Sequence, residues 1–409
     1  MKMHWMMGQL RQIQFFLLTL SVFTVFIGYG IVMPILPFLL ESRFGGGAGF
    51  SVAWHTGMMT SVFMFMLFIF APLWGKISDR VGRRQVILLG LGGSIIALMM
   101  FGIAQQLWFS YFMRALGGAL ASAVLPVSLA YIADTCSKEI RARRFAWISG
   151  SATLGLLLGP LIGGWLSDGI GWLETAPFDA ILFPFISVSI FGLLVWIALF
   201  MRLNEPVAVV AKLKPERVIE KTNRQSTTSN ILLYLALLGM FALGSFEVGI
   251  ALQGQQVLNL TVFQIGILYM TCGVTMLVIQ ICLFSLLIRH FSFVQIIICS
   301  LLIMAIGIGL FPLFTRFEFI LIAVALVGFS SGVLVPVLAY QASLSADISR
   351  GELLGKQTAA GSLGQALGSI LAGGLFGTMT QAPFWFASGL LILGTLLIIK
   401  YARIQLESA

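Results

Sequence analysis

The chain has 409 residues, of which 59% are hydrophobic and only 10% are charged, and its mean hydropathy is +1.02. A soluble globule cannot be built from this composition, because too few polar side chains remain to cover its surface. The net charge of +9 would by itself suggest a nucleic-acid partner, but the basic residues are spread over short loops, and membrane topology explains them better.

Twelve apolar segments are long enough to cross a bilayer as helices, which takes about 20 residues each. The segments are continuously apolar and do not alternate with polar residues, so helices are favoured over a β-barrel. The sequence therefore predicts an all-α integral membrane protein with twelve transmembrane helices. The predicted spans are residues 13–40, 52–74, 85–104, 107–133, 143–167, 178–201, 230–252, 263–288, 293–314, 318–342, 357–378 and 383–402.

The basic residues set the predicted orientation. With the N-terminus inside, only Arg43 and Arg316 of the 24 Lys and Arg residues fall in outer loops, and only Arg114 falls within a span away from its cytoplasmic end. The positive-inside rule then places the N- and C-termini in the cytoplasm. We expect a multi-pass protein of the cytoplasmic (inner) membrane that contacts membrane lipid.

The second half of the chain repeats the first at a constant, ungapped offset of 209 residues. This offset places Ser122–Tyr131 on Ser331–Tyr340 and Arg141 on Arg350. Each half has six spans that start on the same side, so the repeats are parallel and pseudo-symmetric, an arrangement suited to alternating access by rocking. The predicted domains are an N-terminal six-helix bundle at 1–203, a cytoplasmic linker at 204–229 and a C-terminal six-helix bundle at 230–409.

A dense charge cluster with glycines separates the second and third spans, and it reads Gly75-x-x-x-Asp79-Arg80-x-Gly82-Arg83-Arg84. This loop resembles the signature of the major facilitator superfamily. The resemblance implies a charge chain that latches the two halves shut on the inner side, with Asp79 attracted to the N-terminus of the eleventh span. The alternative is a solvated basic loop. The implied latch residues are Gly75, Asp79, Arg80, Gly82, Arg83, Arg84 and Asp134.

The fifth span carries glycines at four-residue spacing together with a proline, in a pattern that resembles the antiporter motif of this superfamily. Such glycines leave one bare helix face that lets another helix approach closely, and the proline removes a backbone hydrogen bond. Close packing without an antiport role is the alternative. The motif residues are Gly155, Gly159, Pro160, Gly163 and Gly164.

The first span ends in Gly30-x-x-x-Pro34-x-x-Pro37, which is similar to the motif of the twelve-span drug:proton antiporters that include the tetracycline exporters. Two prolines one turn apart loosen a helix end. We expect Pro34 and Pro37 to act in gating.

Two charged residues, Arg114 and Glu247, lie within the predicted spans and more than two residues from either end. A charge inside a bilayer costs about 2.5–3.5 kcal/mol on insertion scales and marks a functional candidate. Arg114, in Arg114-x-x-Gly117, resembles the proton-transfer arginine of the superfamily; the alternative is a side chain that snorkels to the interface. Glu247 is the candidate proton carrier, because a low dielectric favours the protonated carboxyl. A solvated place near the outer mouth is the alternative for Glu247.

The candidate substrate cavity is predicted from polar or aromatic side chains in apolar helices. The scarcity of buried charge argues against a highly charged substrate held by ion pairs. The candidates are Tyr29, Gln253, Gln280, Tyr340 and Gln365.

The sequence thus predicts a proton-coupled secondary transporter, not an enzyme, that exports a small amphipathic drug or metabolite. The alternatives are export of one metabolite such as a siderophore, or uptake by proton symport. A membrane enzyme or sensor is disfavoured because the three histidines are far apart in the sequence. The sequence contains no nucleotide-binding loop, so we do not expect ATP to be the energy source. We expect a monomer with a small-molecule substrate and protons as partners. The four scattered cysteines predict no disulfide, metal or cofactor.

Overall fold

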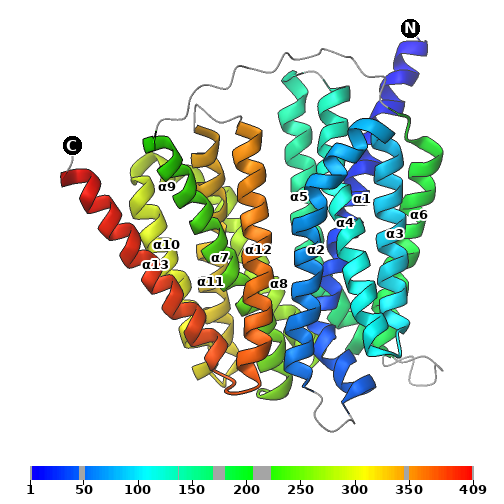
Figure 1. Cartoon of the computed structure of the whole chain (residues 1–409). Helices are drawn as coiled ribbons and strands as arrows, with labels where there is room; N and C mark the ends of the chain where they lie inside the picture. The colour runs from blue at the N-terminus through cyan, green and yellow to red at the C-terminus, as the bar shows by residue number, and fades with distance from the viewer. Residues whose placement is uncertain are drawn as a thin grey trace. The chain divides into compact units, whose positions relative to one another are not determined.

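The computed structural model describes residues 2–45, 51–136, 138–168, 180–205, 223–344 and 350–407, and these residues form helices and turns without any strand (Figure 1). The helices of the first half are α1 Lys2–Phe44, α2 Val52–Val81, α3 Arg83–Ile103, α4 Leu107–Thr135, α5 Lys138–Asp168 and α6 Phe183–Arg202. Those of the second half are α7 Asn223–Gln256, α8 Val262–Cys282, α9 Phe284–His290, α10 Phe293–Leu310, α11 Phe317–Leu344, α12 Arg350–Phe376 and α13 Ala382–Glu407.

Within the described residues, 12 helices are long and apolar enough to cross a membrane, which confirms the predicted fold class. Each corresponds to one predicted span. Large apolar side chains remain exposed on them, such as Ile281 at 78% and Trp108 at 66%. These side chains are suited to lipid, which replaces water as the solvent of a spanning helix.

Many helix ends differ from the predicted span ends by several residues. Helix α2, for example, continues through Val81, where the predicted span ended at residue 74. Gly75, Asp79 and Arg80 are therefore helical.

Three further differences concern the eighth and ninth predicted spans and the predicted linker. The eighth predicted span, 263–288, is interrupted at Leu283, where φ is −107°, and continues as the separate short helix α9. The ninth ends in a 3₁₀ turn at Phe311–Leu313, because Pro312 has no N–H to continue the α-helix. Helix α7 begins at Asn223, inside the predicted linker, and residues 206–222 of that linker lie outside the described residues.

The chain divides into two compact units. The first comprises Met1–Leu39 and Phe65–Pro215, and the second comprises Leu40–Met64 and Glu216–Ala409. The last residues of α1 and the first half of α2 therefore group with the second unit. The predicted domain boundaries at 203 and 230 remain a prediction.

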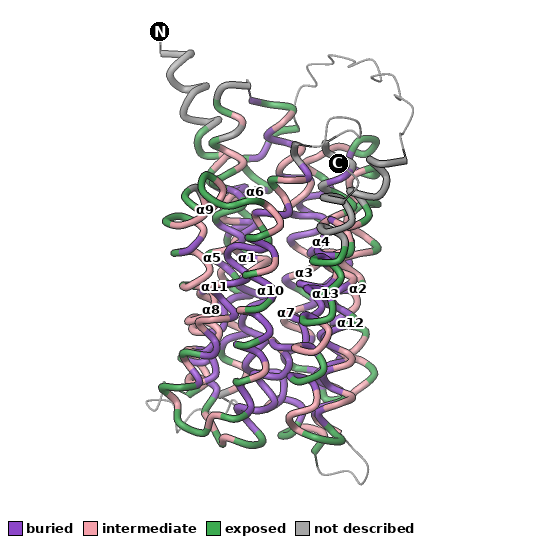
Figure 2. The backbone as a smooth tube through the Cα atoms, turned by 90° about the vertical axis from the view of Figure 1, so that its left-hand side faces the viewer, coloured by how far each residue is buried: buried purple, intermediate pink, exposed green. Residues whose placement is uncertain are grey.

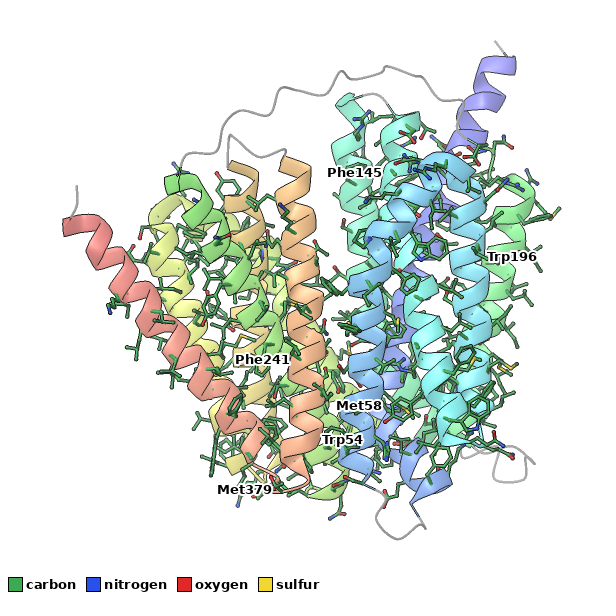
Figure 3. All side chains as sticks on the ribbon, in the orientation of Figure 1. Trp54, Met58, Phe145, Trp196, Phe241 and Met379 are labelled. Atoms are coloured by element: carbon green, nitrogen blue, oxygen red, sulfur yellow. The ribbon has the colours of Figure 1, made fainter. Side chains whose placement is uncertain are left out.

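The first unit has its core among α1, α3, α4, α5 and α6. Leu18 of α1, Leu91 of α3 and Val124 of α4 are fully buried there. Trp196 of α6, labelled in Figure 3, packs against this core. Its indole N–H donates to the Leu88 carbonyl of α3 at 2.9 Å. Figure 2 shows that buried positions recur along the helices and are not confined to one element.

The second unit has an aromatic core. The rings of Phe246 from α7, Phe311 and Phe384 from α13 pack with centroids 5.1 to 6.4 Å apart. All three side chains are almost fully buried. Ring contacts at these distances stabilise the packing of α7, α10 and α13 beyond the burial of area alone.

Candidate functional site

The charge cluster is built on the turn between α2 and α3. Gly82 joins the two helices with φ of +110°, a backbone conformation that side-chain-bearing residues rarely adopt. A Cβ atom at this position would also lie 2.8 Å from the Glu205 Oε1 atom. Gly82 is therefore required both by the backbone and by its neighbour.

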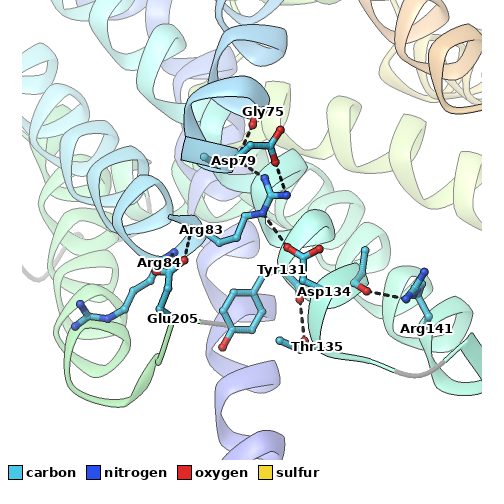
Figure 4. Close-up of polar contacts among 11 residues, drawn as sticks. Gly75, Asp79, Arg83, Arg84, Tyr131, Asp134, Thr135, Arg141 and Glu205 are labelled. Atoms are coloured by element: carbon cyan, nitrogen blue, oxygen red, sulfur yellow. Dashed lines mark hydrogen bonds and ion pairs between the residues drawn. The ribbon is translucent and has the colours of Figure 1, made fainter. Parts of the chain in front are cut away.

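Arg83 lies at the centre of the cluster (Figure 4). Its guanidinium contacts the Asp79 carboxylate at 2.5 Å and the Asp134 carboxylate at 3.0 Å, and it donates to Ser78 Oγ at 2.5 Å. The Arg83 side chain is only 16% exposed, whereas that of Asp79 is 61% exposed. The three charged residues predicted to form a chain are thus in contact, and their action as a latch remains a prediction.

Glu205 belongs to the same cluster, although the sequence placed it in the linker. Its carboxylate accepts hydrogen bonds from the backbone N–H groups of Arg83 at 2.5 Å and Arg84 at 3.0 Å. Helix α3 has no side-chain cap from Gly82 itself. Glu205 therefore caps α3 from across the fold, and its negative charge suits the positive end of the helix dipole.

The Arg84 side chain contacts the end of α6. It forms no ion pair with a carboxylate among the described residues. It donates to the backbone carbonyls of Leu203 at 2.6 Å and Phe200 at 2.7 Å, and its guanidinium lies 5.4 Å from the Phe200 ring. Tyr131 of α4 donates to the Asn204 carbonyl at 2.8 Å. Arg84 and Tyr131 together satisfy carbonyls that the end of α6 leaves unpaired.

The other two predicted latch residues lie more openly. Arg80 is exposed at the end of α2. A Cβ atom at Gly75 would meet no described atom within 4 Å. Neither packing nor backbone geometry requires glycine at position 75 in this conformation.

The glycines of the fifth predicted span lie against α1. A Cβ atom at Gly155 would lie 2.8 Å from the Phe23 carbonyl oxygen, and one at Gly159 would lie 2.8 Å from the Gly30 Cα atom. A Cβ atom at Gly163 would lie 3.0 Å from the Ile31 Cα atom. The bare face of α5 thus packs directly on the α1 backbone, and an antiport role beyond this packing remains a prediction.

The proline-containing motifs do not interrupt their helices. Pro34 and Pro37 lie inside α1, and Pro160 lies inside α5. All three are buried, as is Gly164. The gating role of Pro34 and Pro37 remains a prediction.

Arg114 lies inside the first unit. It is 4% exposed, and its guanidinium lies 5.5 Å from the centroid of the Phe101 ring. Tyr29 of α1, itself 7% exposed, is close enough to interact with the Arg114 charge. The structure thus brings together a predicted proton-coupling residue and a predicted cavity residue.

Glu247 is half-buried in α7 and pairs with a second predicted residue. The Gln365 amide of α12 donates to the Glu247 carboxylate at 2.7 Å, and Tyr269 of α8 donates to the Glu247 backbone carbonyl at 2.5 Å. Close approach of the helices allows this pairing, because a Cβ atom at Gly244 would lie 2.5 Å from the Gln365 carbonyl oxygen. An acid and an amide 118 residues apart thus form one polar site.

The remaining predicted cavity residues differ in exposure. Gln253 of α7 is 2% exposed, Gln280 of α8 is half-buried and Tyr340 of α11 is 42% exposed. A different pair, missed from the sequence, lies near the end of α1, where Gln255 donates to the Glu41 carboxylate at 2.5 Å. In the sequence, the one indication of this contact is that Glu41 and Gln255 each follow the outer end of a predicted span.

Residues 18–290 match the family described as the Major Facilitator Superfamily. The chain is 25% identical over 400 residues to the quinolone resistance protein NorA of Staphylococcus aureus, covering 96% of this chain and 98% of that protein. It is 24% identical over 387 residues to multidrug resistance protein 2 of Bacillus subtilis, covering 93% of each.

Solved transporters share the fold. A bacterial homologue of the human lysosomal transporter Spinster, in an inward-facing and occupied conformation, aligns with a TM-score of 0.79 at 15% identity, over 96% of this chain and 97% of that chain. A D-xylose-proton symporter aligns with a TM-score of 0.72 at 17% identity, over 94% and 96% of the two chains. Because the family match covers more than half of the chain, the chain belongs to the major facilitator superfamily of membrane transporters, and its relatives include proteins named for resistance to quinolones and to multiple drugs.

Proposed function

We propose that this transporter exports a small amphipathic compound across the cytoplasmic membrane in exchange for protons, by alternating access between its two halves. Two relatives that align over more than nine-tenths of the chain are named for resistance to quinolones or to multiple drugs, which supports efflux. The observation that carries proton coupling is the pairing of Glu247 with Gln365.

A carboxyl group that carries protons must be stable both charged and neutral. The Gln365 amide suits this requirement, because it donates through nitrogen to the ionised carboxylate and accepts through oxygen from the protonated form. A cationic partner would be left unpaired in the membrane when the carboxyl is protonated. The neutral partner of Glu247 therefore favours a proton carrier over a permanent ion pair.

Arg114 takes the second coupling role in this proposal. Its charge lies inside a span, beside Tyr29 and over the Phe101 ring. A charge in this place costs free energy, and an apolar side chain could fill the same space without that cost, so a function is the simplest reason for the arginine. The cluster of Asp79, Arg83 and Asp134 serves as the latch that favours one of the two conformations through contacts made only in that conformation. The protein acts as a monomer with both termini in the cytoplasm.

Transport in proteoliposomes tests the proposal. With wild-type protein, a small amphipathic compound from the panel below should move against its gradient only while a proton gradient is imposed. Glu247→Gln should abolish this movement, because the amide cannot carry a proton. The matched control is Glu318→Gln, which changes an exposed acid at the start of α11 and should transport normally. Transport by Glu247→Gln at the wild-type rate would refute the carrier assignment.

Intact cells distinguish export from uptake by proton symport. Cells that contain an exporter accumulate more compound when an uncoupler collapses the proton gradient, whereas cells that contain a symporter accumulate less. A panel that includes quinolones and siderophores would separate a broad drug exporter from one with a single metabolite substrate.

A further inference from the structure

The second unit contains a cavity of about 260 Å³ that includes none of the five predicted cavity residues. It lies among helices α7, α10, α11 and α12. Its walls are mostly aliphatic or thioether side chains such as Leu235, Met240, Met304 and Leu338. This volume is slightly below the range of about 300–1,000 Å³ of drug sites, so the cavity suits a molecule smaller than a typical drug.

Two buried polar atoms on the cavity wall lack hydrogen-bond partners among the described residues. They are the hydroxyl oxygen of Ser331, a residue only 2% exposed, and the side-chain amide oxygen of Gln357. Leaving such a group unsatisfied costs about 1–3 kcal/mol, so native structures rarely retain it without a purpose. Both atoms accept hydrogen bonds, and the Ser331 hydroxyl also donates.

The internal repeat shows that the fold itself does not need these polar groups. At the offset of 209 residues, Ser122 of the first half corresponds to Ser331, and Ile148 corresponds to Gln357. Ser122 donates to the Ala119 carbonyl of its own helix at 2.7 Å, and Ile148 is fully buried. The first half thus satisfies one position locally and keeps the other apolar, whereas in the second half both residues line a cavity and their acceptor atoms are covered and without a described partner.

We propose that this cavity is a binding site for an uncharged, mostly apolar molecule that carries a hydrogen-bond donor, held through Ser331 and Gln357. Among the residues that the structure describes, no charged side chain lines the cavity, so a charged molecule would be buried there without a described counter-ion. Both acceptor atoms are covered in this conformation, so in the proposed complex the Ser331 and Gln357 side chains turn toward an N–H or O–H group on the molecule, while its rings or chains contact the aliphatic wall. The inference rests on the proposed function, because it gives the class of compound that this transporter carries.

Binding to the purified full-length protein tests the site without a proton gradient. Equilibrium dialysis would compare 2-naphthol, which has one O–H donor, with 2-methoxynaphthalene, which has the same rings and no donor. Ala339→Phe places a ring in the cavity, so any 2-naphthol that remains with this variant is bound by the detergent and not by the site. Gly361→Leu is a second variant with a filled cavity. Size-exclusion chromatography checks that each variant is folded.

The wild-type protein should bind 2-naphthol saturably, and both filled variants should abolish that binding. Ser331→Ala and Gln357→Met should each weaken the binding affinity for 2-naphthol about 3- to 10-fold, as expected for the loss of one hydrogen bond. The affinity for 2-methoxynaphthalene should remain almost unchanged. The matched control Ser122→Ala should have no effect. Equal binding of the two probes would indicate an apolar occupant such as a lipid chain, and would overturn the proposal.

The two proposals fail in different ways. If the wild-type protein binds 2-naphthol in this pattern but exports nothing in vesicles, the proposed export is wrong and the cavity assignment stands. If the protein exports its substrate but the filled variants bind 2-naphthol as the wild type does, the cavity assignment is wrong.

Discussion

Glu205 shows how a single side chain organises the charge cluster. Its carboxylate accepts two backbone N–H groups at the start of α3 while its own backbone follows the end of α6. Capping of this kind is usually local, by the residue just before the helix. Here that residue is Gly82, which has no side chain, so the acceptor comes from 122 residues away.

Replacing Glu205 should therefore destabilise the first unit. Glu205→Ala removes both acceptors from α3, and we expect a loss of about 1–2 kcal/mol, as for other helix caps. Glu205→Gln should cost less, because the amide oxygen still accepts. Thermal unfolding in detergent measures both variants against Glu318→Ala, and an unchanged melting temperature for Glu205→Ala would contradict the capping role.

Gly82→Ala should destabilise for two separable reasons. The backbone at φ +110° costs about 1–3 kcal/mol for a residue with a Cβ atom, and that atom would also lie too close to the Glu205 carboxylate. In the Glu205→Ala background only the backbone cost remains. The drop in melting temperature on adding Gly82→Ala should then be smaller than in the wild type; an equal drop would show that the Glu205 contact contributes nothing.

At the scale of helices, the sequence located the elements better than their contacts. The apolar length of a segment is a local property, so each of the twelve spans was predicted. The interruption at Leu283 was not predicted, because no proline or glycine lies near it in the sequence. The glycine spacing in α5 predicted a bare face but not its partner. That partner is α1, where Gly30 provides the matching close approach.

Two glycines of α5 allow a matched test of this packing. At Gly159 a Cβ atom would lie 2.8 Å from the Gly30 Cα atom, whereas at Gly150 it would meet nothing described within 4 Å. Gly159→Ala should lower the melting temperature because the two backbones must separate. Gly150→Ala should leave it unchanged or raise it, since alanine favours a helix by up to about 1 kcal/mol. The reverse order would contradict the α1–α5 contact.

For the whole molecule, composition predicted the class of protein, and the orientation drawn from the Lys and Arg bias stays a prediction. The polar sites depend on distant pairs. Arg83 was expected to meet Asp79 and Asp134, and it does so. The partners of Glu247 and Glu205 were not predicted, because they lie 118 and about 122 residues away and no local pattern specifies them. The cavity around Ser331 was missed for the same reason, since four helices contribute to its wall.

Alternating access gives a prediction for Gly75, which has open space around it in this conformation. Gly75→Ala should leave the melting temperature unchanged. If the other conformation brings a helix against this position, the same change should slow transport in proteoliposomes several-fold. Transport at the wild-type rate would show that position 75 stays open throughout the cycle.

The location of Glu205 also decides where this chain can be divided. Co-expression of the two halves as separate fragments is a common way to ask whether each folds without a covalent connection. A first fragment that stops at the end of α6, or at residue 203, would contain all six predicted spans of the first half and still leave the start of α3 without its acceptor. A fragment extended by two residues, through Glu205, keeps that acceptor, so the functional border of the first half lies beyond its last transmembrane residue.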